Sequence, residues 1–140
     1  MSGADAKDGN LAPHLAERYQ AYIDCLNRQD WANLPRFVAE DVRYNEETIG
    51  LSGYCAMLQG NYRDIPDLRF KVAILVHDQQ RVASRLQFDC TPVADFLGIA
   101  VNGRRISFAE NVIYQFGAGK IEAVWSVIDK AAIEAQLRSS

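Results

Sequence analysis

The sequence has few of the residues on which metal sites and disulfide frameworks depend. Its 140 residues include only three cysteines and two histidines. Cys25, Cys55 and Cys90 are odd in number, lie far apart and form no Cys-x-x-Cys pair, so we expect free thiols in a reducing cytoplasm. His14 and His77 are isolated from each other and from the cysteines. We therefore expect no metal ion.

Long apolar runs and an excess of basic residues are also missing. The opening segment 1–10, MSGADAKDGN, carries no apolar stretch, so we expect no secretory signal, no membrane span and a disordered N-terminus. The net charge of −3 provides no broad basic surface for nucleic acid or for an anionic membrane. No repeat or linker divides the remainder, which predicts a single domain over residues 11–140.

The hydrophobic pattern changes period along the chain. Before Pro66 the apolar residues have helical spacing. After Pro66 apolar and polar residues alternate with period two. The expected helices are 14–29, 30–39, 52–64 and 130–138, with Asp30 and Ser52 as caps of the second and third. The expected strands are 41–45, 68–77, 81–90, 105–116 and 120–128. This order predicts an α+β fold in which a strongly curved sheet folds over helices as a cone with an open mouth.

Several segments together resemble the SnoaL-like polyketide cyclase or ester cyclase family, within the nuclear-transport-factor-2-like superfamily. They are AEDVRYN (39–45), DFLGIAVNGRRISF (95–108), Tyr114, GKIEAVW (119–125) and Asp129. The resemblance implies a cone-shaped fold, a small hydrophobic or aromatic carbonyl ligand and a homodimer. It also implies an intramolecular aldol ring closure that needs no cofactor: a carboxylate removes a proton next to a carbonyl, and the enolate attacks an internal aldehyde or ketone.

The resemblance breaks at the positions of the family's acid and base. Aligned through the GKI motif, the family's catalytic aspartate falls on Ser126 and its assisting histidine on Val112. A family glutamine two residues earlier falls on Glu110. The known pair cannot be transferred, so the chemistry has moved, has been lost, or serves another ligand.

Glu110 is the residue that least fits its surroundings. The alternate positions of its strand are Phe108, Glu110, Val112, Tyr114 and Phe116. The other four favour burial, so the carboxylate is expected on the same side, where desolvation would raise its pKa toward that of a general base. The alternative is a structural carboxylate paired with an arginine: Arg43, Arg81 or Arg85.

Most of the other candidate residues have two interpretations. Asp129 is either a second catalytic carboxylate or the cap of the last helix. The resemblance places Tyr44 and Asn45 where relatives have a polar residue facing the cavity, and either could polarise a carbonyl oxygen. Tyr44 has a second interpretation, as a core aromatic whose hydroxyl reaches water. Ser126 is either a hydrogen-bond donor to ligand or a small cavity residue.

Further candidates would line the pocket. Phe96, Phe108, Val112 and Trp125 are the expected hydrophobic contacts for a flat ligand, and loop 91–100 is the expected lid.

The opposite sheet face is expected to join two copies of the chain. Ala109, Ile113 and Val127 would lie there. Two functions remain open: an enzyme that abstracts a proton with Glu110, and a non-catalytic module of the same fold that binds a hydrophobic ligand or mediates dimerisation.

Overall fold

The computed structural model describes residues 11–139, with side chains from residue 14 onward. The disorder expected for segment 1–10 concerns residues outside this range. The elements are α2 (Leu11–Asn27), η1 (Trp31–Arg36), β1 (Val38–Tyr44), β2 (Glu47–Thr48), α3 (Gly50–Asp64), β3 (Lys71–His77), β4 (Arg81–Cys90), β5 (Ile106–Gly117), β6 (Lys120–Ile128) and α4 (Lys130–Arg138). None of the helices in this range is long and apolar enough to cross a membrane.

The period-two pattern predicts the long strands closely, whereas the first three helices start at other residues than expected. Asp30 precedes η1 but makes no side-chain cap bond, and η1 is a short 3-10 helix with Pro35 inside it. Proline has no N–H for the helical ladder, so a longer α-helix is disfavoured there. Helix α3 begins two residues before Ser52, after Ile49, which makes no side-chain cap bond either. Asp30 therefore has the predicted N-cap position without the side-chain bond, whereas the expected cap at Ser52 is wrong because Ser52 lies inside α3.

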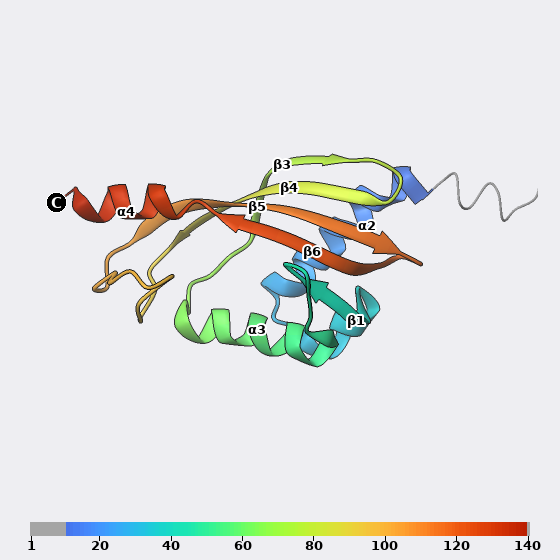
Figure 1. Cartoon of the computed structure of the whole chain (residues 1–140), viewed down its shortest axis with the longest axis horizontal. Coiled ribbons are helices and arrows are strands. Elements are labelled where there is room, and N and C mark those ends of the chain that lie inside the picture. The colour runs from blue at the N-terminus through green and yellow to red at the C-terminus, as the bar shows by residue number, and fades with distance from the viewer. Residues whose placement is uncertain (1–10, 140) are drawn as a thin grey trace, which may run out of the picture.

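The six strands form one curved sheet in the order β2-β1-β6-β5-β4-β3. Strands β3 to β6 are the expected antiparallel meander, and β1 joins β6 in parallel. Figure 1 shows the sheet passing over α3, with α4 continuing beyond the end of β6. The α+β class and the unclosed, curved sheet over helices are confirmed.

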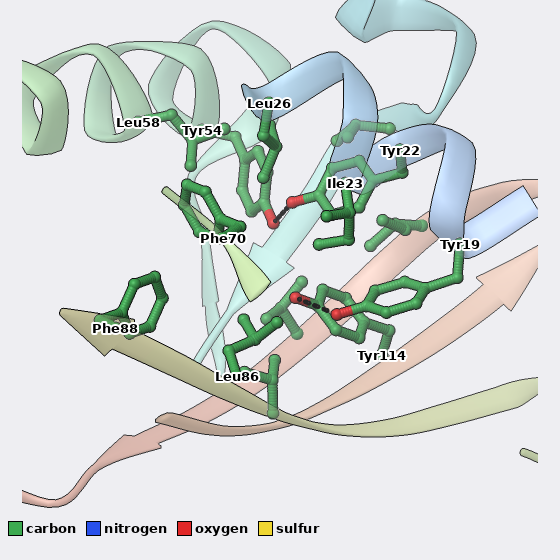
Figure 2. Close-up of a cluster of buried hydrophobic side chains, with 14 of the residues drawn as sticks. Tyr19, Tyr22, Ile23, Leu26, Tyr54, Leu58, Phe70, Leu86, Phe88 and Tyr114 are labelled. Atoms are coloured by element: carbon green, nitrogen blue, oxygen red, sulfur yellow. Dashed lines mark hydrogen bonds between the residues drawn. The ribbon is translucent and has the colours of Figure 1, made fainter. Parts of the chain in front are cut away.

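The core fills the space between the inner sheet face and the helices α2 and α3. Alternate residues of β4 and β5 are buried, as one-sided strands require. Four tyrosines lie deep in this core and pair through their hydroxyls (Figure 2): Tyr22 with Tyr54 at 2.7 Å and Tyr19 with Tyr114 at 3.4 Å. Burial raises the pKa of all four phenols, which keeps them protonated.

The outer sheet face carries exposed apolar side chains. The exposed fractions are 56% for Ile74, 58% for Val76, 45% for Ile113 and 69% for Val127. Ala109 differs from the expectation, because it is buried at the end of β5 against which α4 packs. The exposed apolar set therefore extends over β3, β5 and β6 on the outer face.

Candidate functional site

A pocket of about 230 Å³ opens between α3 and the inner face of the sheet. Most of its wall is apolar, and its polar members are Tyr44, Asn61 and Glu110. The apolar wall consists of Met57, Ile65, Leu68, Phe70, Phe88, Phe96, Leu97, Phe108 and Ile128. Asn61 and Leu97 are its exposed members, so they mark the mouth, and the largely buried Glu110 lies deeper.

Glu110 points into this pocket from the middle of β5. Its cross-strand partners are Leu86 on β4 and Ile128 on β6, so apolar side chains flank it on both sides. None of the ion pairs among the described side chains includes Glu110. Arg81 pairs with Asp78, and Arg85 donates to Asn111. The structure therefore does not show the alternative in which Glu110 is a structural carboxylate paired with an arginine.

Among the described residues, one group donates a hydrogen bond to the carboxylate of Glu110: the hydroxyl of Ser126. Burial raises the pKa of the Glu110 carboxyl above its ordinary value of 4.5, and the Ser126 hydroxyl partly opposes that shift. An ion pair would lower the pKa strongly, whereas a single neutral donor leaves the raised pKa in place. The group therefore has the basicity and the location of a general base.

Tyr44 stands beside this pair at the end of β1. Burial raises the pKa of its phenol, the neighbouring Ser126 hydroxyl lowers it, and the Glu110 charge raises it. The phenol is thus a protonated donor on the pocket wall. Its ring also meets that of Tyr54 edge-on at 6.3 Å, which joins the pocket to the tyrosine core.

Asn45 does not face the ligand space, contrary to the expectation. Its side-chain oxygen accepts from the Ser126 N–H at 2.9 Å, and its amide nitrogen donates to the Ser126 carbonyl at 3.4 Å. Its backbone has φ +47°, a left-handed conformation that asparagine tolerates. Asn45 therefore extends the pairing of β1 with β6 and fixes the backbone that carries the Ser126 hydroxyl.

Ser126 is not part of the pocket wall and meets it only through its hydrogen bond to Glu110. Three other predicted site residues also lie outside the pocket. Asp129 accepts a hydrogen bond from the Ala132 N–H at 3.1 Å and caps α4, as its alternative interpretation holds. Trp125 lies on the outer sheet face and donates to Glu46 at 2.7 Å. Val112 is buried on the inner face but is not part of the pocket wall.

Comparisons with known proteins identify the family of the chain. The family model described as SnoaL-like polyketide cyclase matches residues 16–137. The chain belongs to this family. A crystal structure of a SnoaL-like polyketide cyclase from Agrobacterium tumefaciens is 52% identical, has a TM-score of 0.87, and is matched over 88% of this chain and 97% of that one. No curated protein matches the chain.

More distant structures share the fold of this SnoaL-like family member. TsrD from Streptomyces laurentii is 21% identical with a TM-score of 0.77, over 91% of this chain and 97% of that one. IdmH from Streptomyces antibioticus is 19% identical with a TM-score of 0.76, over 88% and 97%. Together with the structure at 52% identity, the observed curved sheet over helices confirms the predicted cone-shaped, nuclear-transport-factor-2-like fold.

Several pocket residues of this SnoaL-like chain escaped the sequence interpretation. Met57 and Asn61 are one turn apart on α3, and Ile65 and Leu68 follow the helix before β3. The i, i+4 spacing of Met57 and Asn61 could have indicated this, because it places both side chains on one face of the helix. Across residues 11–139, no three histidine, cysteine or acidic side chains gather closely enough to hold a metal ion.

Proposed function

We propose that the protein is a cofactor-independent enzyme in which Glu110 removes a proton next to a carbonyl of a hydrophobic aromatic substrate. The observation that carries this proposal is a carboxylate deep in an apolar pocket, with one hydroxyl donor and no cationic partner among side chains 14–139. A base in such a site is poorly solvated and gains most by accepting a proton from a bound carbon acid.

The reaction balances without any further reagent. The Glu110 carboxylate takes the proton from the carbon next to the carbonyl, and the electron pair of that bond moves to the carbonyl oxygen as an enolate. The Tyr44 phenol is the wall donor available to the enolate oxygen. The enolate carbon then attacks an internal aldehyde or ketone to close a ring, and the new alkoxide takes the proton back from Glu110. Where a carbon–carbon double bond is conjugated with the enolate, return of the proton from Glu110 to the far carbon of that system moves the double bond and gives isomerisation instead.

The pocket wall favours a flat, neutral ligand. A row of aromatic rings lines one side: Phe70 meets Phe88 at 5.3 Å, Phe88 meets Phe108 at 5.2 Å and Phe96 meets Phe108 at 5.2 Å. Such rings bury aromatic ligand surface through offset or edge contacts. The wall carries no arginine or lysine, so an anionic group has no counter-charge there.

We also propose that the outer sheet face joins a second copy of the chain. The exposed side chains Ile74, Ile113 and Val127 surround a shallow groove in which Arg85 is the only charged residue. A largely uncharged apolar face of this kind suits a self-complementary contact across a twofold axis. Sedimentation at micromolar concentration should show a dimer, and Val127→Asp should convert it to monomer. A monomeric wild-type protein would contradict the proposal.

The test of the enzymatic proposal is exchange of the protons next to the carbonyl of β-tetralone, followed by NMR in deuterated water. Wild-type protein should accelerate exchange, and Glu110→Gln should reduce the acceleration by about 10²-fold or more. Glu122→Gln, which alters an exposed carboxylate on β6, is the matched control and should behave as wild type. Binding of the ketone without accelerated exchange would favour the non-catalytic binding module instead.

A further inference from the structure

Four two-residue turns among the described residues have positive φ at both positions. One is Asn45-Glu46, with φ of +47° and +74°, and the other three each end in glycine. Leu97-Gly98 has φ of +53° and +76°, Asn102-Gly103 has +56° and +73°, and Ala118-Gly119 has +51° and +79°. Each places a non-glycine residue in the left-handed region and a glycine after it. This is the form in which asparagine-glycine is the preferred pair.

Leu97 is the residue least suited to its turn. Asparagine tolerates the left-handed region through local hydrogen bonding, whereas a leucine there places its Cβ against the following carbonyl oxygen. The turn is tightly closed, because Phe96 and Ile99 exchange two backbone hydrogen bonds of 2.9 Å each. The same loop uses Asn102 in its second turn, so leucine at position 97 is not required for making a turn.

Leu97 also differs from the other two turn residues in what it faces. It lines the pocket, whereas Asn102 and Ala118 do not. Phe96 anchors the turn by packing on Phe108 of the inner sheet face, with ring centres 5.2 Å apart. The Leu97 side chain next to it remains 40% exposed at the mouth.

We propose that Leu97 is a specificity-determining residue, whose side chain covers the far end of an elongated aromatic ketone bound with its carbonyl toward Glu110. The inference rests on the proposed ligand pocket but not on catalysis in it. A ligand that reaches the mouth completes the burial of Leu97, and this contact accounts for a leucine in a backbone conformation that disfavours it. A short ligand leaves Leu97 exposed and gains nothing from it.

The experiment measures the dissociation constants of β-tetralone, with two rings, and acetylphenanthrene, with three, together with melting temperatures. All binding is measured in the Glu110→Gln background, so that it does not depend on turnover. Leu97→Asn should raise the melting temperature by a few degrees and weaken acetylphenanthrene binding about tenfold, with β-tetralone unaffected. Leu97→Ala should weaken the same ligand without raising the melting temperature.

Ala118→Asn is the matched control, because it relieves an equivalent turn away from the pocket. It should raise the melting temperature and leave both dissociation constants unchanged. Unchanged acetylphenanthrene binding in both Leu97 variants, or a lower melting temperature in Leu97→Asn, would overturn the inference. Failure of the parent protein to bind either ketone would overturn the ligand pocket and this inference together, whereas failure of the exchange assay alone would leave the binding results standing.

Discussion

The hydroxyl of Ser126 donates a hydrogen bond to the carboxylate of Glu110 across two neighbouring strands. The two residues are diagonal neighbours on the inner face, because Glu110 pairs with Ile128 and Ser126 pairs with Val112. Position 126 is where the family resemblance places the catalytic aspartate. The pair therefore supports the interpretation that the carboxylate has moved from β6 to the adjacent strand β5 while keeping its place in the pocket.

Removing the Ser126 hydroxyl should raise the pKa of Glu110 further. A hydrogen bond to an ionised group contributes about 1.5–3 kcal/mol, which corresponds to about one to two pKa units. In Ser126→Ala, the acidic limb of the pH profile of kcat/KM for proton exchange should move upward by about that amount. Ser84→Ala removes a buried serine of the same sheet face whose hydroxyl neighbours Tyr19 and does not act on Glu110, and should leave the profile unchanged. An identical profile for Ser126→Ala and wild type would contradict the assigned contact.

Returning the carboxylate to β6 should restore part of the activity. We expect Glu110→Gln combined with Ser126→Asp to exchange β-tetralone protons at least about tenfold faster than Glu110→Gln alone, because the carboxylate would occupy the diagonal position in the same pocket. Both variants are compared at equal folded concentration, verified by circular dichroism. A double variant as inactive as Glu110→Gln would argue that the site depends on the geometry of β5 and that the two positions are not interchangeable.

Glu110 should also make the stability of the protein depend on pH. Its folded-state pKa is raised above the ordinary 4.5, so the folded state binds the proton more tightly than the unfolded state. The free energy of unfolding should therefore fall as the pH rises from the ordinary pKa of glutamate to the folded-state pKa, and stay lower above it. Glu110→Gln should remove this loss, so the variant is more stable than wild type at neutral pH and about equal to it near pH 4. Urea unfolding at several pH values measures the difference, and a constant gap across that range would contradict it.

The Tyr22 and Tyr54 hydroxyls should be strongly coupled in stability. Tyr54→Phe leaves the buried Tyr22 hydroxyl without its partner at 2.7 Å, which costs about 1–3 kcal/mol of the free energy of unfolding. The double change to phenylalanine removes both polar groups and should be less destabilising than the sum of the single changes. Tyr19→Phe breaks a longer contact of 3.4 Å to Tyr114 and should cost less than Tyr54→Phe. If the double variant loses as much free energy of unfolding as the two single variants together, the hydrogen bond between Tyr22 and Tyr54 contributes nothing to stability.

Local hydrophobic patterns predicted most of the secondary structure. The bounds of β4, β6 and α4 match the expected ranges, because alternation and turn residues act locally. The parallel pairing of β1 with β6 was not predictable in this way. The paired residues are about eighty positions apart in the sequence, and no turn joins these two strands to indicate that they pair.

Part of the candidate site was also predictable from local alternation along a strand. The alternation of β5 correctly placed Glu110 among buried neighbours. The prediction of Trp125 as a pocket residue was wrong. Successive strand residues point to opposite faces, so Trp125 could not share a face with Ser126, which bonds to Glu110. The role of Asn45 could not be predicted, because it depends on β1 lying beside β6.

The measurement that tests the account most directly is a carbon-13 NMR titration of the glutamate side-chain carboxyl groups, with the Glu110 signal assigned by its loss in Glu110→Gln. We predict that the Glu110 carboxyl titrates above pH 4.5 and that its signal shifts when β-tetralone is added. A carboxyl that titrates at or below that value, with a signal unaffected by the ketone, would contradict a base held in the ligand pocket.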